Sequence, residues 1–261
     1  MIVAGVDIGS LSSKAVVIEN SVIKAQSLTL TGPNSTQSAT TAMDLALKDC
    51  NLSLKDIDYI VGTGYGRVNI PFAQHTVTEI SCHAKGNHWL FPETRTILDM
   101  GGQDCKTIRC NEKGNVTNFT MNDKCAAGTG RYLERVAAIL GLQLKQIGPF
   151  SLEPIQGPCQ IRSHCLVFAE NDIINLVHEG KHTNDILAGV MEAIVDTVYI
   201  LMQRVGIEKA LCISGGIAKN IGVVSRLEKK CGLKARIAAE PQIVGAIGAA
   251  LFALDYASPK D

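Results

Sequence analysis

The sequence predicts an α/β protein built by duplication, with two similar lobes that face each other across a cleft. Two observations carry this prediction. First, residues 2–18, IVAGVDIGSLSSKAVVI, and residues 96–110, TILDMGGQDCKTIRC, share one pattern. In each, an apolar run leads to Asp-x-Gly, a small turn, a lysine and a second apolar run, which is typical of a strand, a tight turn and a strand. Second, a later short apolar run ends in a Gly-Gly pair followed by a helical pattern.

Length and composition support a folded protein with two medium domains. The chain has 261 residues, of which 46% are hydrophobic and 19% are charged, so it can bury a full core. Its 25 basic and 25 acidic residues give a formal net charge of zero. Because no basic run or interleaved aromatic stripe occurs, we expect neither nucleic acid nor an anionic membrane surface as a partner.

The cysteines and the N-terminus indicate the cellular compartment. Nine cysteines in a chain without an export signal favour reduced thiols or metal ligation over a disulfide framework. The N-terminus MIVAGVDIGS has no basic segment, and its apolar run is interrupted by Asp7. The longest apolar stretch, Ile243 to Leu254, is shorter than the ~20 residues that a membrane-spanning helix needs. We therefore expect a cytoplasmic protein.

The two matched hairpins place the same residue types at equivalent positions. Asp7 aligns with Asp99 and Lys14 with Lys106, and a glycine follows each aspartate by two residues. Glycines permit the tight turn and expose backbone N–H groups that can bind phosphate. A carboxylate at the end of a strand can hold Mg²⁺ directly or through water. Two such hairpins facing each other would bind the phosphates of a nucleotide from both sides.

The Gly-Gly pair completes the set of motifs. Gly215 and Gly216 follow the short apolar strand Leu211 to Ser214 and open a helix, which lets the backbone approach a flat or anionic ligand closely. The P-loop pattern GxxxxGK[ST] and the Rossmann pattern GxGxxG are both missing from the sequence. A single Asp-x-Gly hairpin is more often an ordinary turn. The ordered set of two matched hairpins and a Gly-Gly pair favours nucleotide binding of the two-hairpin kind.

This order of motifs resembles the actin, Hsp70 and sugar-kinase superfamily, which has a duplicated ribonuclease H-like fold around a nucleotide cleft. Within it, the chain resembles the activator ATPases (component A) of 2-hydroxyacyl-CoA dehydratases, of the BadF/BadG/BcrA/BcrD type. The resemblance implies a first lobe of residues 1–94 plus 240–261 and a second lobe of residues 95–239. It is carried by GVDIGSLSSK, TGYGR, EISCHAKG, LDMGGQDCK, MNDKCAAGTGRYLE, HCLVFAEND, SGGIAKN and PQIVGAIGAALFA.

The resemblance implies a site for ATP or ADP with Mg²⁺ between the lobes. Asp7 and Asp99 would organise the Mg²⁺, and Asp7 would take part in catalysis. Gln103 would orient the attacking water, by analogy with glutamines in other nucleotide hydrolases, and Asp104 is the alternative for this role. The phosphates and the adenosine would be bound by Ser10, Leu11, Ser12, Ser13, Lys14, Gly101, Gly102, Gln103, Gly215, Gly216 and Gln242.

The resemblance also implies one [4Fe–4S] cluster per homodimer, held by Cys125 and Cys165 of each subunit. Two cysteines from each of two subunits supply the four thiolates that such a cluster needs. Each cysteine precedes an expected helix, one from Gly130 onward and the other over Leu166 to Val177. Because helix N-termini carry partial positive charge, they would stabilise an anionic cluster. Cys159 remains an alternative ligand.

The implied activity is an ATPase coupled to electron transfer. A low-potential donor such as ferredoxin or flavodoxin would load the cluster, and ATP would drive one electron to a 2-hydroxyacyl-CoA dehydratase or a related reductase. Two other functions stay open. A sugar or N-acyl-sugar kinase of the same fold would need a hydroxyl-bearing substrate and a base in the cleft. An ATP-gated regulatory module without a redox role would bind ATP and contain no iron.

Overall fold

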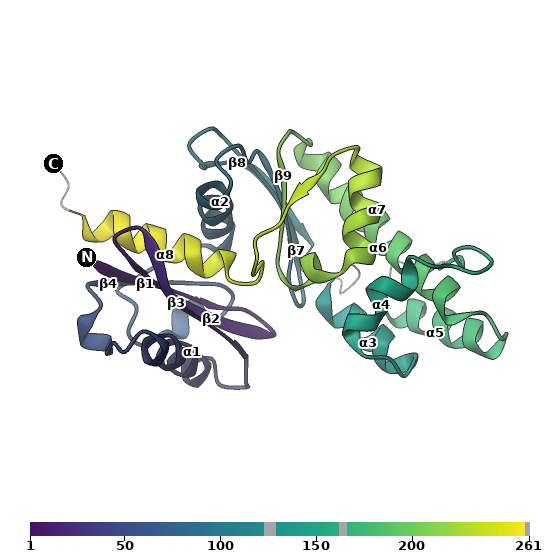
Figure 1. Cartoon of the computed structure of the whole chain (residues 1–261), viewed down its shortest axis with the longest axis horizontal. Coiled ribbons are helices and arrows are strands. Elements are labelled where there is room, and N and C mark those ends of the chain that lie inside the picture. Colours follow the sequence, from purple (N-terminus) through teal and green to yellow (C-terminus); the bar gives the residue numbers. More distant parts are fainter. Residues whose placement is uncertain (123–128, 162–165, 259–261) are drawn as a thin grey trace.

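The computed structural model of the chain describes residues 1–122, 129–161 and 166–258. Two five-stranded mixed sheets lie one after the other along the long axis of the molecule, with helices on their faces (Figure 1). The predicted cluster ligands Cys125 and Cys165 lie outside the described residues. No helix in the described ranges is long and apolar enough to cross a lipid bilayer.

The first sheet comes from the N-terminal part of the chain. Its strand order is β3-β2-β1-β4-β5, with bounds β1 Ile2–Ile8, β2 Ser12–Glu19, β3 Val22–Leu30, β4 Tyr59–Thr63 and β5 His75–Thr76. Helix α1 (Ser35–Asp49) covers one face of the sheet and α8 (Val244–Ala257) covers the other. Because both faces of β1 are buried, its sequence is almost continuously apolar rather than alternating.

The second sheet repeats the topology of the first. Its order is β10-β9-β6-β7-β8, with bounds β6 Thr96–Met100, β7 Cys105–Cys110, β8 Val116–Asn122, β9 Leu211–Ser214 and β10 Ala235–Arg236. In each sheet the central strand pairs antiparallel with the following strand and parallel with a later one. The register places Asp7 opposite Lys14 and Asp99 opposite Lys106. The predicted duplicated α/β fold is therefore confirmed.

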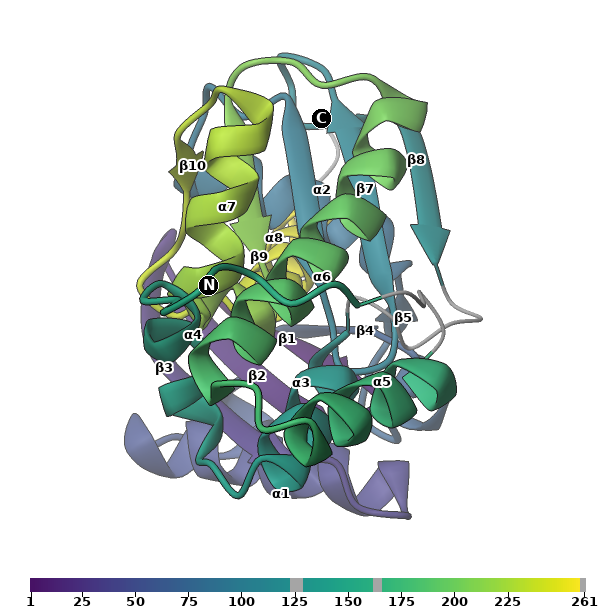
Figure 2. The same ribbon diagram turned by 90° about the vertical axis from the view of Figure 1, so that its right-hand side faces the viewer.

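The remaining helices surround the second sheet. Figure 2 shows α6 crossing one face of this sheet with α7 beside it, and α3, α4 and α5 lie at the end of the molecule far from the N-terminus (Figure 1). Asn34, Thr78 and Asn220 cap α1, α2 and α7 through side-chain oxygens that accept first-turn N–H groups. The bounds are α2 Glu79–Leu90, α3 Gly130–Ile139, α4 Leu144–Ser151, α5 Leu166–His178, α6 Thr183–Val205 and α7 Ile221–Cys231.

The segment after the Gly-Gly pair differs from the sequence-based expectation. Gly216–Lys219 forms a short 3-10 turn, and α7 begins only at Ile221. The helix begins there because the side-chain oxygen of Asn220 accepts the backbone N–H of Val223 at 3.1 Å. The Gly-Gly pair therefore forms a turn between strand and helix rather than the start of the helix.

Glycines allow β1, α8 and α2 to pack with their backbones in contact. A Cβ atom at Gly5 of β1 would overlap the carbonyl oxygen of Ala246 in α8, and one at Gly248 of α8 would overlap the carbonyl oxygen of Cys82 in α2. Only glycine fits such close backbone approaches. Helix α2 also lies against the second sheet, so this stack connects the central strand of the first sheet to the second sheet.

The close crossing of α2 and α8 predicts whether Gly248→Ala raises or lowers the free energy of unfolding. Ala is favoured over Gly in helices, but we expect Gly248→Ala to lower the free energy of unfolding by about 1–3 kcal/mol, because the added methyl group overlaps backbone. Thermal unfolding measures this. Gly130→Ala is the control, because a Cβ there lies 3.4 Å from its nearest neighbour. A Gly248→Ala variant as stable as the parent would contradict the packing.

Candidate active site

A cleft of about 640 Å³ lies between the two hairpins and receives lining residues from both sheets. Ser13 does not line the cleft. It is fully buried on the other side of β2, where its hydroxyl lies 2.7 Å from that of Thr31. The other residues assigned to the nucleotide site from the sequence do line it: Asp7, Ser10, Leu11, Ser12, Lys14, Asp99, Gly101, Gly102, Gln103, Asp104, Gly215, Gly216 and Gln242.

The first hairpin presents a buried carboxylate to the cleft. Lys14 Nζ donates to Asp7 Oδ2 at 3.1 Å, and both side chains are almost fully buried. The turn closes through the backbone bond from Gly9 N to Ser12 O at 3.0 Å. Gly64, in the TGYGR motif, has φ of +87°, and a Cβ there would overlap the Asp7 carboxylate. The motif therefore leaves room for Asp7, and the positive φ explains why glycine occupies the position.

The second hairpin repeats this arrangement with one addition. Lys106 Nζ lies 3.8 Å from Asp99 Oδ2 and 2.7 Å from Asp104 Oδ2, so one lysine serves two carboxylates. The turn closes from Gly101 N to Asp104 O at 2.9 Å. Gln103 is exposed at the turn and lines the cleft. The Asp104 carboxylate is held by Lys106, which leaves Gln103 better placed to contact a water molecule in the cleft.

The charges around Asp99 keep it ionised. Burial by itself would raise the pKa of Asp99, but His83, Lys106, the Ser214 hydroxyl and Lys14 together hold it below its usual value. Burial likewise acts to lower the pKa of Lys106, but the two neighbouring carboxylates raise it overall. Near neutral pH the second hairpin therefore contains a carboxylate and an ammonium group, both charged.

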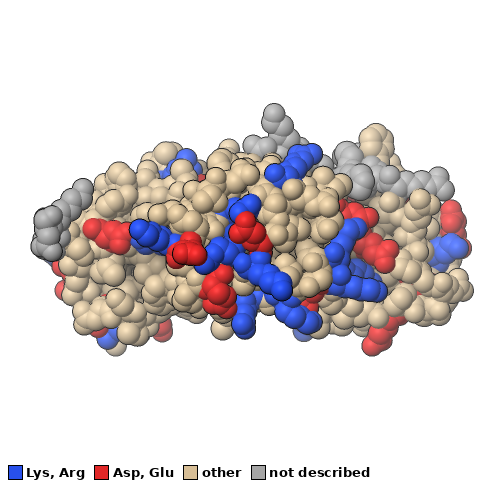
Figure 3. Space-filling view, turned by 90° about the horizontal axis from the view of Figure 1, so that it is seen from above, with Lys and Arg blue, Asp and Glu red and all other residues tan. Residues whose placement is uncertain are grey.

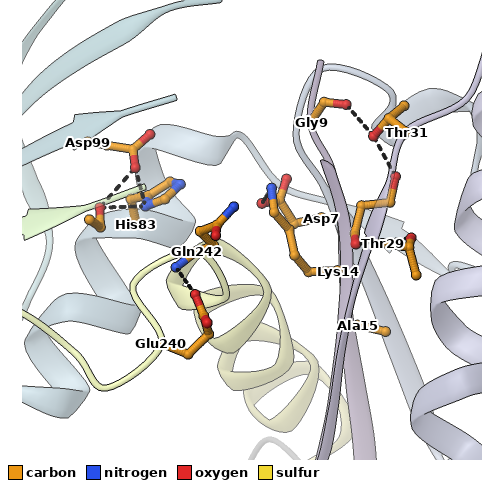
Figure 4. Close-up of polar contacts among 12 residues, drawn as sticks. Asp7, Gly9, Lys14, Ala15, Thr29, Thr31, His83, Asp99, Glu240 and Gln242 are labelled. Atoms are coloured by element: carbon orange, nitrogen blue, oxygen red, sulfur yellow. Dashed lines mark hydrogen bonds and ion pairs between the residues drawn. The ribbon is translucent and has the colours of Figure 1, made fainter. Parts of the chain in front are cut away.

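His83 belongs to the site although the sequence interpretation left it out. It is 6% exposed on α2, and its Nδ1 lies 3.2 Å from Ser214 Oγ and 3.4 Å from Asp99 Oδ1 (Figure 4). Ser214 Oγ donates to the same Asp99 oxygen at 2.9 Å. His83 stands in the EISCHAKG motif, and Glu79, one helical turn earlier, also lines the cleft, where it accepts from Arg67 at 3.2 Å.

The Gly-Gly turn forms the other end of the cleft. Gly215 has φ of +84°, and its N–H donates to Pro241 O at 2.9 Å. The ideal Cβ position at Gly216 lies 3.6 Å from the side-chain nitrogen of Gln242. The backbone N–H of Gln242 donates to Glu240 at 3.1 Å (Figure 4). A side-chain-free backbone surface next to an amide suits a planar base with polar edges.

Backbone hydrogen bonds join the second hairpin to α3. Gly130 N donates to Gly101 O at 2.9 Å, and Arg131 N donates to Gly102 O at 3.0 Å. From the opposite side, Leu11 of the first hairpin fills the space that a side chain at Gly102 would need. The turns of both hairpins and the first turn of α3 thus form one contiguous contact. The segment that carries Cys125 directly precedes this helix.

Residues 4–253 match the sequence profile of the BadF/BadG/BcrA/BcrD ATPase family. The chain belongs to this family. Membership in an ATPase family implies binding of ATP or ADP.

The chain is 41% identical to the activator of lactoyl-CoA dehydratase from Anaerotignum propionicum, over the full length of both. Solved structures of two other relatives have the same fold. It is 35% identical to component A of the Acidaminococcus fermentans (R)-2-hydroxyglutaryl-CoA dehydratase, covering 99% and 100% of the two chains with a TM-score of 0.95. The Clostridium difficile 2-hydroxyisocaproyl-CoA dehydratase activator with bound ADPNP is 38% identical, covering 98% and 96%, with a TM-score of 0.93.

Burial raises the pKa of the Cys105 and Cys159 thiols. Cys105 is fully buried, and Cys159 packs partly buried against the helical core. Within residues 1–122, 129–161 and 166–258, no group of three or more His, Cys, Asp or Glu side chains could hold a metal ion.

Charges of both signs are mixed on one face of the molecule. On the face drawn in Figure 3, acidic side chains lie beside basic ones.

Removing the charge of Asp99 tests the site. Asp99→Asn should lower Mg²⁺-dependent ATP hydrolysis about 100-fold, because a buried anion that would face the metal and the phosphates is lost. Phosphate release at saturating ATP measures this. Cys105→Ala, in the same hairpin but facing the core, is the control and should keep most of the activity. Undiminished hydrolysis in Asp99→Asn would contradict the assignment.

Proposed function

We propose that this protein is an ATP-driven electron donor that activates a 2-hydroxyacyl-CoA dehydratase or a related reductase. The observation that carries the proposal is the pair of hydrogen bonds from Gly130 and Arg131 to the carbonyls of Gly101 and Gly102. They connect the phosphate end of the cleft to the helix that follows Cys125. Relatives whose names state that they activate dehydratases support the choice of partner.

In this proposal the cleft binds Mg²⁺ and ATP. Asp7 and Asp99 organise the metal, and their carboxylates fit this role because both face the cleft. Lys14 and the turn residues Ser10, Leu11 and Ser12 hold the phosphates from one side, and Gly101, Gly102 and Gln103 hold them from the other. Ser13 acts indirectly, by fixing the hairpin through Thr31. Gln103 orients the attacking water, and Gly215, Gly216 and Gln242 contact the adenosine.

The proposal also includes a [4Fe–4S] cluster between two copies of the chain. Helices α3 and α5 follow the two proposed ligands, Cys125 and Cys165, and pack against each other, with Arg135 Nε 3.0 Å from Glu170 Oε1. Two such segments beside one another can supply two thiolates, and a second copy supplies the other two. Such a cluster provides one low-potential electron, which ferredoxin or flavodoxin would replace.

Exposed apolar side chains on α5 support a contact with a second copy. Phe168 is 63% exposed, and Ile174 and Val177 are 39% and 44% exposed. Cys159 remains the alternative cluster ligand in this proposal. Its backbone N–H is bound to Asp185 O at 2.9 Å, and its carbonyl lies against Gly189 of α6. The loop around Cys159 is therefore fixed to its own subunit.

Nucleotide binding would act on α3 through the hairpins. We propose that residues 1–94 plus 240–261 and residues 95–239 close on ATP as two lobes. A γ-phosphate between the hairpins favours the closed state, and a ligand shifts an equilibrium only through such a difference in affinity. Movement of Gly101 and Gly102 would then move the start of α3, because the two are hydrogen-bonded.

Removing one proposed cluster ligand separates electron transfer from hydrolysis. Protein purified without oxygen should contain about two iron atoms per chain, as expected for one four-iron cluster per homodimer. Cys125→Ala should lose this iron and keep ATP hydrolysis within about threefold, because the hairpins are unchanged. Iron and sulfide assays with gel filtration measure this.

Cys159→Ala is the matched control and should retain the iron. A monomer with four iron atoms of its own would contradict the shared cluster. A protein without iron that phosphorylates a sugar would replace the proposal with a kinase.

A further inference from the structure

His83 lies between the aspartates of the two hairpins. Its Nδ1 faces Asp99 and Ser214 in the second sheet, and its Nε2 faces the start of α8. At Gly245 an ideal Cβ would lie 3.0 Å from His83 Nε2 and 3.0 Å from Asp7 Oδ2. The imidazole therefore reaches from the carboxylate of one hairpin to the immediate surroundings of the other. The missing side chain at Gly245 keeps the space between them open.

The hydrogen-bond geometry determines which ring nitrogen carries a hydrogen. A carboxylate oxygen only accepts, and the Ser214 hydroxyl already donates its hydrogen to Asp99 Oδ1. A favourable contact of Nδ1 with either partner therefore requires a hydrogen on Nδ1. His83 and Ser214 thus converge on the same oxygen of Asp99. The other oxygen, Oδ2, lies toward Lys106.

The backbone holds His83 in this position. Gly86, on the same helix, lies so close to α8 that a Cβ would overlap the carbonyl oxygen of Val244. Asn87 Nδ2 donates to the carbonyl oxygen of His83 at 2.9 Å. Because α2 is in backbone contact with α8, the backbone of His83 is fixed relative to α8.

We propose that His83 is a positioning residue that fixes the Asp99 carboxylate for the Mg²⁺-nucleotide. This inference rests on the proposed role of Asp99. Because His83 and Ser214 hold Oδ1, the Asp99 carboxylate cannot turn both oxygens toward Lys106 Nζ. Its Oδ2 therefore stays available on the cleft side. Groups that orient a metal-organising side chain typically contribute 10- to 100-fold to metal affinity. Figure 4 shows His83 beside the Asp99 oxygen that it contacts.

Mn²⁺ binding tests this role without an activity assay. Mn²⁺ is titrated into the protein with saturating ADP, and the EPR signal reports free Mn²⁺. We expect His83→Ala to raise the Mn²⁺ dissociation constant about tenfold. His83→Asn should recover part of the loss, because its amide nitrogen is bonded to Cγ as Nδ1 is and can donate to Asp99. ADP binding in the presence of EDTA should stay within about twofold of the parent, because the adenosine contacts are elsewhere.

Two further variants complete the design. His88→Ala, on the same helix, is the matched control, because its ring packs against Gly114 outside the cleft and Mn²⁺ affinity should not change. His83→Leu, which is of similar size and has no hydrogen-bond donor, should reproduce the loss seen with His83→Ala. It replaces that variant in the comparison with His83→Asn if His83→Ala does not fold.

The outcomes separate this inference from the proposed function. Normal Mn²⁺ affinity in His83→Ala or His83→Leu, with weakened affinity in Asp99→Asn, would overturn the role of His83 alone. Normal affinity in Asp99→Asn would overturn the metal assignment itself. An equal loss of ADP binding in EDTA would show that His83 supports the cleft as a whole and does not position Asp99 for the metal.

Discussion

The two backbone hydrogen bonds between the second hairpin and α3 are the contact on which the proposed function depends. Gly101 and Gly102 line the cleft, while their carbonyls accept from Gly130 and Arg131. One turn of backbone is thus shared between a nucleotide site and a helix start. Because Gly102 has no side chain, Leu11 of the first hairpin can pack onto the same turn. A change in hairpin separation would be transmitted directly to α3.

The rest of the fold holds the elements behind this contact in fixed positions. Backbone contacts at Gly5, Gly86 and Gly248 hold β1, α8 and α2 together, and α2 lies against the second sheet. The two sheets are therefore linked by closely packed elements on this side, and between the hairpin turns the side chain of Leu11 lies against Gly102. The cleft is thus closely packed on the side of β1, α8 and α2. On the other side lie the two hairpin turns, whose separation could respond to a phosphate group.

Local sequence patterns predicted much of the fold and of the candidate site, and the features that they missed depend on non-local contacts. The hairpins were predictable because strand, turn and lysine follow one another within 15 or so residues, and the strand Leu211–Ser214 has the expected bounds. Alternation along β2 could also have shown that Ser13 faces away from Ser12 and Lys14. His83 could not be found in this way, because its partners Asp99 and Ser214 come from distant strands. The cysteine roles came from family resemblance, since no periodicity distinguishes a ligand from a packed thiol.

The measurement that tests the central claim most directly is the midpoint potential of the cluster in two nucleotide states. EPR-monitored redox titrations without oxygen would compare the protein saturated with ADP and with a non-hydrolysable ATP analogue. The account predicts different potentials, by about 60 mV or more, which corresponds to about 1.4 kcal/mol for a one-electron step. Parallel titration of Cys105→Ala should give the same difference. Identical potentials in both states would contradict the claim that the nucleotide cleft controls electron transfer.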